Sequence, residues 1–246
     1  RIMIIGLRRP LAGAPLGAYL QSSSKLLCKN LLAAAGLPHP PLWSELNAGR
    51  PDAKRPEKLI VKSVWEHASF GLDQGSIVAP EDARAEIARR EARFGGSFFA
   101  ETYIEGREFN LSLLQTAEGA RVLPMAEMAF DALPDTHARI VDYDAKWNQA
   151  SVGFQTMQRR FGVEAREPTL AGRMQTLALE LWRAAELRGY ARVDMRISPE
   201  HEIFILEFNA NPCLAPDAGF MAAAAEAELS FDAVIAAIVA AAHRSA

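Results

Sequence analysis

The sequence has few of the features that mark secreted, membrane or nucleic-acid-binding proteins. Its 246 residues contain only two cysteines, Cys28 and Cys213, far below the density of disulfide-stapled domains. The net charge of −3 gives no reason to expect nucleic acid or an anionic membrane surface as a partner. No apolar run approaches the roughly 18 residues of a membrane span, and the alanine-rich stretch 231–242 is shorter. Because no secretion signal is visible either, we expect a cytoplasmic protein with free thiols.

Several well-known active-site signatures are also missing. The chain has neither a Gly-x-x-x-x-Gly-Lys-Ser/Thr nor a Gly-x-Gly-x-x-Gly motif, so ordinary P-loop and dinucleotide-binding sites are excluded. It has no Gly-x-Ser-x-Gly nucleophile elbow. No second metal ligand stands at zinc spacing from His67. Any phosphate chemistry must therefore use another arrangement of side chains.

The chain mixes expected strands and helices without strict alternation, which favours an α+β fold over a doubly wound parallel sheet. A hydrophobic content of 50% is enough for one large domain or two small ones. Thr169 is the expected cap of a long helix and Gly189 its end. Residues 131–162 show no period, and loops of that length are usually functional or disordered. Other helices are predicted over 25–35, 80–94 and 231–242, and strands over 58–63, 76–79, 97–104, 109–115, 121–128, 191–197 and 202–208.

The last two predicted strands carry polar residues at alternate positions. Side chains two apart on a strand share a face, so Arg192 points with Asp194, and Glu207 with Asn209. The short turn 198–201 makes the strands antiparallel neighbours, which brings both pairs to one face. Mg²⁺ is bound by one or two carboxylates together with waters and phosphates. The pattern indicates a metal–phosphate site, although an edge hairpin with a merely solvated face has the same alternation.

Lysines and small residues upstream could serve a phosphate. Lys62 ends an apolar strand, and a compact point charge on a rigid element suits a phosphate. Residues 66–71 contain small side chains whose backbone N–H groups could form an anion-binding concavity. Lys25 opens the first helix. Each of these features is also compatible with an ordinary solvated surface.

The motifs together resemble the ATP-grasp superfamily, and most closely the D-alanine–D-alanine ligases. Arg-Val-Asp, a turn and Leu-Glu-Phe-Asn-Ala-Asn-Pro resemble the metal-binding end of that family. The resemblance implies that Asp194, Glu207 and Asn209 hold two Mg²⁺ ions, for which Mn²⁺ can substitute. It also implies that Arg192 lies near an acyl phosphate as a catalytic residue.

The resemblance extends to the nucleotide. The segment Glu-x-x-Ile-x-Gly-x-Glu-Phe at 101–109 is similar to the adenine hinge, and Tyr-Asp-Ala-Lys-Trp at 143–147 is similar to the lid that closes over ATP. Lys146 of the lid is implied to reach the phosphates as a second catalytic residue. The other implied ATP contacts are the phosphate-binding Lys25, Lys62, Ser69 and Gly71, the adenine-binding Glu101, Tyr103 and Ile104, and the ribose-binding Glu108.

The family fold implies two α+β subdomains that grip ATP between antiparallel sheets. We expect a small subdomain over 22–108 and a large one over 109–246. Residues 1–21 would be a remnant or linker of an N-terminal domain that is otherwise missing or truncated, and a homodimer or partner protein could supply that domain. The chain begins with Arg1 rather than methionine, so we expect missing sequence upstream.

The implied activity is ATP-dependent ligation of a small carboxylate to a small, amino-acid-like amine through an acyl phosphate, releasing ADP and phosphate. The substrate end departs from the family: Cys213 replaces a glycine, and Ala218 stands near a carboxylate-binding serine. We therefore expect His67, Arg192, Cys213 and Asp217 to contact substrate, Asp217 to favour a cationic amine, and the product not to be D-Ala–D-Ala. The alternatives are an ATP-grasp kinase, a carboxylase-like enzyme, or a non-catalytic ATP-binding module of a larger complex.

Overall fold

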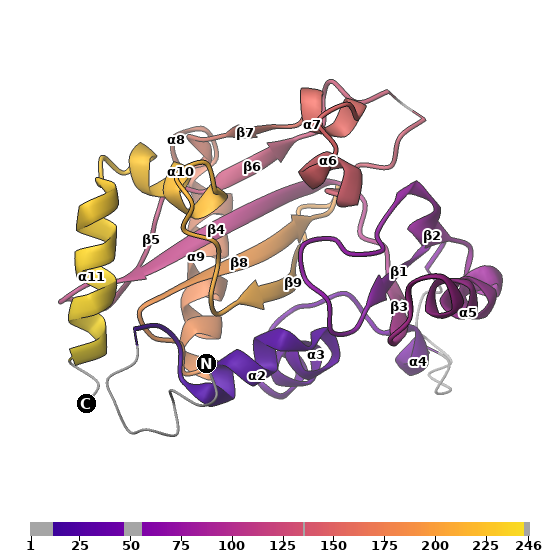
Figure 1. The fold of residues 1–246 in the computed structure, drawn as a ribbon, viewed down its shortest axis with the longest axis horizontal. Coiled ribbons are helices and arrows are strands. Elements are labelled where there is room, and N and C mark those ends of the chain that lie inside the picture. The colour runs from indigo at the N-terminus through magenta and orange to yellow at the C-terminus, as the bar shows by residue number, and fades with distance from the viewer. Residues whose placement is uncertain (1–11, 47–55, 135, 244–246) are drawn as a thin grey trace.

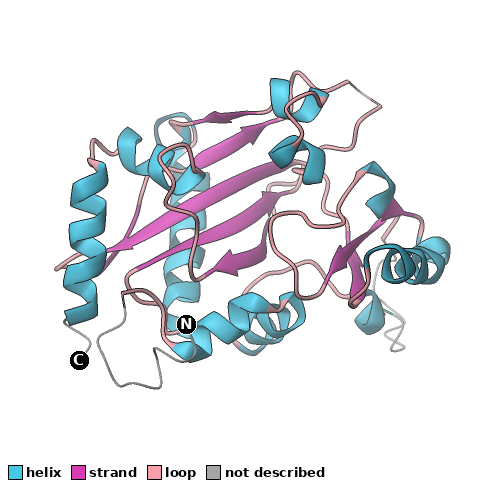
Figure 2. Cartoon of the chain, in the orientation of Figure 1, coloured by secondary structure: helices cyan, strands magenta, loops and turns pink. Residues whose placement is uncertain are grey.

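The computed structural model describes residues 12–46, 56–134 and 136–243, which form two antiparallel sheets of different size with helices around them (Figures 1 and 2). The N-terminal half of the predicted remnant lies outside the described residues. Among those described, no helix is both long and apolar enough to cross a membrane. The helices are α2 (Leu16–Ser23), α3 (Lys25–Ala34), α4 (Trp43–Leu46), η1 (Gln74–Ser76), η2 (Pro80–Asp82), α5 (Ala83–Phe94), α6 (Tyr143–Trp147), α7 (Val152–Thr156), α8 (Val163–Arg166), α9 (Pro168–Ala184), α10 (Gly219–Glu226) and α11 (Phe231–His243). The strands are β1 (Leu59–Ser63), β2 (Ile77–Val78), β3 (Phe98–Thr102), β4 (Arg107–Gln115), β5 (Ala120–Val122), β6 (Ala126–Ala129), β7 (Gln158–Arg160), β8 (Tyr190–Ile197) and β9 (Ile203–Asn209).

The smaller sheet has the strand order β2-β1-β3. Its central strand β1 is almost continuously apolar, and only Lys62 is less than fully buried. Helix α5 covers the sheet through a compact core that includes Leu59, Val61, Ala83 and Phe98. The sheet therefore presents Lys62 at the end of a rigid, well-packed strand, as the sequence indicated.

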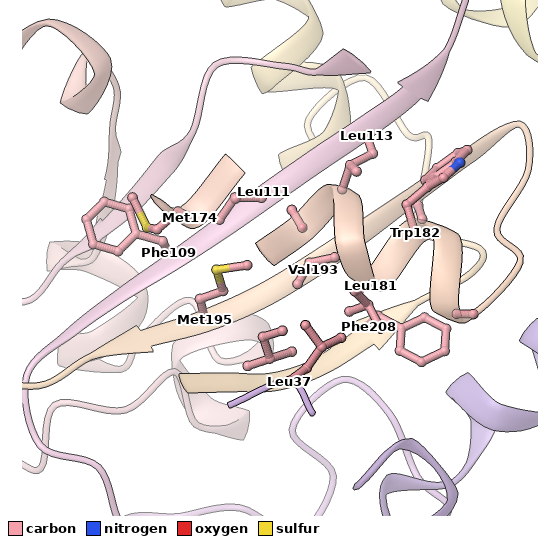
Figure 3. Close-up of a cluster of buried hydrophobic side chains, with 14 of the residues drawn as sticks. Leu37, Phe109, Leu111, Leu113, Met174, Leu181, Trp182, Val193, Met195 and Phe208 are labelled. Carbon is pink, nitrogen blue, oxygen red and sulfur yellow. The ribbon is translucent and has the colours of Figure 1, made fainter. Parts of the chain in front are cut away.

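The larger sheet has the order β7-β6-β4-β8-β9, with β5 also paired to β4. The side chains of strand β4 alternate between the two faces of the sheet. One face is therefore buried, and the other carries polar residues. Phe109, Leu111 and Leu113 point towards α9 and pack with its Met174 and Leu181 (Figure 3). The opposite face carries polar residues near the hinge and becomes apolar under α10 and α11, where Leu114 is buried.

Helices α2 and α3 connect the two sheets. Cys28 and Leu32 of α3 belong to the core of the larger sheet, together with Ala18 of α2. Leu26, on another side of α3, packs against a small apolar cluster of the smaller sheet that includes Phe99. Residues from the predicted linker and small subdomain thus help to build the core of the large sheet.

The segment between β3 and β4 is a hinge rather than an ordinary hairpin. β3 pairs with β1, whereas β4 pairs with β8, β6 and β5, so the two consecutive strands belong to different sheets. Gly106 in the hinge has a φ of 122°, and a Cβ there would collide with the carbonyl oxygen of Ile197. Only glycine allows this close approach of the hinge to β8.

Three element predictions need correction. The predicted strand 121–128 is divided into β5 and β6 by Leu123–Met125, where Pro124 has no N–H to donate to a ladder. The long helix begins at Pro168 and has Glu167 at its N-cap position, so Thr169 does not cap it. That helix also ends at Ala184, before Gly189. The aperiodic region 131–162 contains the short elements α6, α7 and β7.

Candidate functional site

A cavity between the two sheets gathers most of the residues predicted to bind ATP and metal. Its empty volume is about 780 Å³, which includes space open to solvent. The apolar side chains of Ile60, Leu72, Ile140 and Leu206 contribute part of the wall. The predicted residues that line it are Lys25, Lys62, Ser69, Glu101, Tyr103, Ile104, Glu108, Lys146, Asp194 and Glu207.

The polar face of the large sheet is arranged by strand register. Asp194 lies directly opposite Glu207, and Arg192 lies opposite Asn209, as the alternating pattern predicted. Arg192 forms a two-point ion pair with Asp194, with N–O distances of 2.7 and 2.8 Å. That neighbouring carboxylate raises the pKa of the Arg192 guanidinium, although burial opposes the shift. Asn110 of β4, which no sequence motif indicated, donates to Asp194 at 3.0 Å.

Cations surround the Glu207 carboxylate. Lys25 approaches it at 3.5 Å and also donates to the Glu66 carbonyl at 2.6 Å. Burial by itself would raise the pKa of Glu207, but Lys25, Lys62 and other cations lower it to about 2. The pKa of Lys146 is lowered, first by burial and then by the nearby Arg192 charge. The site concentrates positive charge around two carboxylates, which suits a polyanion bound with a divalent cation.

Glu101 is the anchor of a buried ion triad. Its side chain is 1% exposed and contacts Lys62 at 2.8 Å and Lys29 at 2.9 Å. Burial would raise the pKa of Glu101, but the two lysines lower it below its usual range. Lys29 was not predicted, although it lies four residues after Lys25 on the same helix face, and that spacing is the signal that marks it.

The hinge presents backbone groups to the cavity. The N–H of Tyr103 donates to the Lys58 carbonyl at 3.1 Å, and the carbonyl of Ile104 accepts a hydrogen bond from Arg196 at 2.7 Å. Arg196 also lies 3.4 Å from Glu108 and over the Tyr103 ring. Arg196 was not predicted, yet the alternation that selected the earlier polar residues of β8 continues to it.

The loop 66–72 is joined by hydrogen bonds to the segment 141–147, which contains the predicted lid 143–147. Ser69 donates from its hydroxyl to the Val141 carbonyl at 2.7 Å, and the Trp147 indole donates to the Ala68 carbonyl at 3.2 Å. Gly71 does not line the cavity. It has a φ of 64°, and its carbonyl accepts from the buried Arg90 of α5, so its place is at the base of the loop.

The predicted metal ligands suit Mg²⁺ better than a metal ion that is enclosed by protein ligands alone. No group of three or more His, Cys, Asp or Glu residues with metal-binding geometry occurs in the described part of the chain. Mg²⁺ commonly needs only one or two protein carboxylates, with phosphates and waters completing the shell. Asp194 and Glu207 lie directly opposite each other on neighbouring strands. Like charges in this placement destabilise the strand pairing unless nearby cations compensate them. Asn209 is oriented by the Asn211 N–H, which donates to its Oδ1 at 2.8 Å.

A second cavity lies at the end of β9 that carries Asn209. Its empty volume is about 1,130 Å³, again open to solvent. The predicted substrate residues His67 and Cys213 line it together with Asn209. Burial lowers the pKa of His67, and the charges around it partly cancel. Asp217 is exposed and lines neither cavity.

The fold is that of ATP-grasp enzymes. The chain superposes with a TM-score of 0.71 on D-alanine–D-alanine ligase from Bacillus anthracis complexed with ATP. The sequence identity is 18%, and the match covers 99% of this chain and 73% of the other. The VanG D-Ala:D-Ser ligase from Enterococcus faecalis gives a TM-score of 0.69 at 19% identity, covering 95% of this chain and 65% of that one.

Residues 54–240 match the family described as "D-ala D-ala ligase C-terminus", so the chain belongs to the D-alanine–D-alanine ligase family. It is 32% identical over 228 residues to D-alanine–D-alanine ligase of Desulforudis audaxviator, covering 90% of this chain and 69% of that protein. It is 30% identical over 234 residues to the uncharacterized protein y4sG of Sinorhizobium fredii, covering 94% of this chain and 65% of the relative. The chain thus spans about two thirds of the length of these relatives.

Proposed function

We propose that this chain carries the ATP- and Mg²⁺-binding site of a carboxylate–amine ligase that works through an acyl phosphate. One observation carries the proposal. Asp194 and Glu207 lie opposite each other on adjacent strands, and they line the same cavity as lysines from three separate elements. The lysines are Lys25 of α3, Lys62 of β1 and Lys146 of α6. This charge pattern complements a nucleotide triphosphate that carries its own cation.

ATP lies with its adenine at the hinge and its phosphates towards the lysines. Since the Tyr103 N–H and the Ile104 carbonyl are used within the protein, we assign the Tyr103 carbonyl and the Ile104 N–H to the adenine edge. Glu108, which lines the cavity near the hinge, accepts from the ribose hydroxyls. Glu101 supports the adenine end, and it also holds Lys29 and Lys62 in place. Ser69 and Gly71 shape the loop that covers the phosphates.

The reaction has two displacements. A substrate carboxylate oxygen bonds to the γ-phosphorus as the bond to the ADP oxygen breaks. An amine nitrogen then bonds to the acyl carbon, the carbon–oxygen bond to phosphate breaks, and the amine loses a proton. Asp194, Glu207 and Asn209 would hold Mg²⁺, which neutralises charge on the transferring phosphoryl group when bound. Arg192 and Lys146 stabilise the developing charge, and the lid keeps water from the acyl phosphate.

The product we propose differs from D-Ala–D-Ala. The relatives named D-alanine–D-alanine ligase give that activity as one possibility for this chain. At the substrate end, however, Cys213 stands where the family motif has glycine and Ala218 stands near the position of a carboxylate-binding serine. A missing hydroxyl donor weakens binding of a second amino acid's carboxylate.

The test is ADP release from Mg-ATP with a panel of carboxylates and amines, in the wild type and in Asp194→Asn. Amine-dependent ADP release is expected in the wild type. We expect it to fall about 100-fold or more in Asp194→Asn, because removing a carboxylate weakens metal and phosphate binding. Asp232→Asn, which removes an exposed carboxylate of α11, is the matched control and should stay within about two-fold of the wild type.

Other results separate the alternatives. ADP release that needs a carboxylate but no amine would identify a kinase or a carboxylase-like enzyme. ATP binding without turnover for any pair would identify a non-catalytic module. Full activity in Asp194→Asn would refute the metal assignment.

A further inference from the structure

The second cavity is walled mainly by aromatic rings and neutral polar groups. Tyr19 comes from α2, Trp65 from the segment after β1, and Tyr190 from the start of β8. Ser22 and Ser23 also line the cavity, and both of their hydroxyls donate to the Tyr19 carbonyl. None of its lining residues in the described part of the chain is Lys, Arg, Asp or Glu. Such a wall recognises an uncharged, flat or bulky group better than an ionic one.

Trp65 is the lining residue that best indicates which kind of group the cavity binds. Its side chain is 56% exposed, although a ring of that size gains much by being covered. The backbone beneath it is fixed, since the Val64 N–H donates to Ser97 and the Val64 carbonyl accepts from Lys25, both at 2.9 Å. The ring is therefore presented from a rigid support, which lowers the entropic cost of binding against it.

The part of the wall formed by Tyr190 is rigid as well. Tyr190 is 5% exposed, and its ring packs edge-on against Phe220 at a centroid distance of 5.7 Å. Its hydroxyl donates to the side chain of Asn211, in the loop that follows β9. The cavity is thus largely preformed before a ligand enters.

The position of the cavity connects it to the reacting end of the site. Asn209 lines it, while Glu207, two residues earlier on the same face of β9, lines the ATP cavity. Arg192, opposite Asn209, borders this junction but is paired with Asp194. A molecule in the second cavity can therefore place one end at the metal-binding end of β9 and the other against Trp65.

We propose that the amine joined by this chain carries an aromatic side chain, which lies in the second cavity against Trp65. This inference rests on the ligase function proposed above and specifies its second substrate. The nitrogen points to Asn209, and the ring lies against Trp65 in the cavity that Tyr19 and Tyr190 also line. A methyl side chain, as in alanine, would leave most of that aromatic surface exposed. The cationic amine expected from Asp217 is not supported, because Asp217 lies outside the cavity.

Cys213 provides a direct readout of occupancy. It is exposed and lines the cavity, whereas Cys28, the only other cysteine, is 1% exposed and so is protected. We would measure the rate of Cys213 alkylation by iodoacetamide with Mg-ADP and either phenylalanine or alanine, each as both enantiomers. Cys213→Ser identifies the labelled site. One phenylalanine enantiomer should slow labelling by about ten-fold at a concentration at which alanine has little effect.

Trp65→Ala should abolish that protection. Phe231→Ala, which removes an exposed aromatic ring on α11, is the matched control and should retain it. Trp65→Gln serves as a second variant, and thermal unfolding shows that each variant folds. Equal protection by alanine, or protection that survives in both Trp65 variants, would overturn the inference.

Amine-dependent ADP release, measured on the same samples with the panel of carboxylates and amines, separates the two proposals. If an amine is required for ADP release but phenylalanine fails to protect Cys213, the amine assignment alone is wrong. If no amine supports ADP release, the ligase function fails and the amine assignment fails with it.

Discussion

At the scale of single residues, the site depends on charges that are buried in compensating pairs. Glu101 holds Lys29 and Lys62, while Arg192 holds Asp194. Removing one member of such a group leaves its partner as an uncompensated charge, which costs about 3–5 kcal/mol in typical buried pairs. The residues proposed to form the nucleotide site are therefore also residues on which folding depends.

Glu207 makes this coupling measurable through pH. Its pKa is lowered from 4.5 to about 2, so its contribution to stability is complete above about pH 4.5 and is lost as pH falls towards 2. The shift corresponds to at most roughly 3–4 kcal/mol, since one pKa unit is worth about 1.4 kcal/mol. We expect the difference in unfolding free energy between wild type and Glu207→Gln, measured in urea, to shrink as pH falls from 5 to the lowest value at which both fold. A difference that stays constant over this range would contradict the assignment.

At the scale of elements, side chains alternate along β4, β8 and β9, so that one face of the sheet packs in the core and the other carries the polar residues of the site. One face of β4 supplies Phe109 and Leu111 to the core under α9, and the other supplies Glu108 and Asn110 to the site. This period of two could be recognised in the sequence because it requires only neighbouring residues. The hinge between β3 and β4 was harder to recognise, because a hairpin and a crossing between sheets share the same local pattern.

Gly106 tests the importance of the hinge. An alanine there would place its Cβ against the Ile197 carbonyl oxygen, at a φ of 122° that side chains rarely adopt. We expect Gly106→Ala to lower the unfolding free energy by about 2 kcal/mol or more and to weaken ATP binding, because β4 must shift away from β8. Gly172→Ala, at an exposed helical position with open space around it, is the control and should stabilise the protein by about 0.5–1 kcal/mol. Equal effects of the two substitutions would contradict this role of the hinge.

At the scale of the whole molecule, the two sheets, the loop 66–72 and the lid enclose one cavity. Contacts between the loop region and the lid link positions more than 60 residues apart in the chain. Gln74 is central to them, since it donates to Asp142 at 3.0 Å and accepts from the Ala138 N–H at 2.7 Å. Asp142 in turn caps α6, the helix that carries Lys146.

Gln74→Ala should therefore loosen the lid without altering any residue that lines the ATP cavity. The loss of two partly exposed hydrogen bonds, about 1 kcal/mol in total, should weaken Mg-ATP binding by about five-fold. It should also speed protease cleavage within residues 131–162, as limited proteolysis with mass spectrometry would show. Gln175→Ala on the exposed side of α9 is the control. If both variants resist cleavage equally, the lid is held by other contacts.

The sequence by itself determined the family, the α+β class and the order of the motifs. It also determined which faces of β8 and β9 carry Asp194, Glu207 and Asn209, because strand periodicity and short turns are local properties. Lys25, Lys62 and Lys146 could be named as candidates, but only the fold brings the three into one cavity.

The tertiary structure decided what depends on contacts between distant segments. It separated β3 and β4 into two sheets, placed Lys29 beside Glu101 and put Gly71 at the base of the loop instead of in the cavity. It also assembled Tyr19, Trp65 and Tyr190 from three separate segments into the wall of a second cavity. No local pattern marks such a wall, because burial and enclosure arise only when the chain has packed against itself.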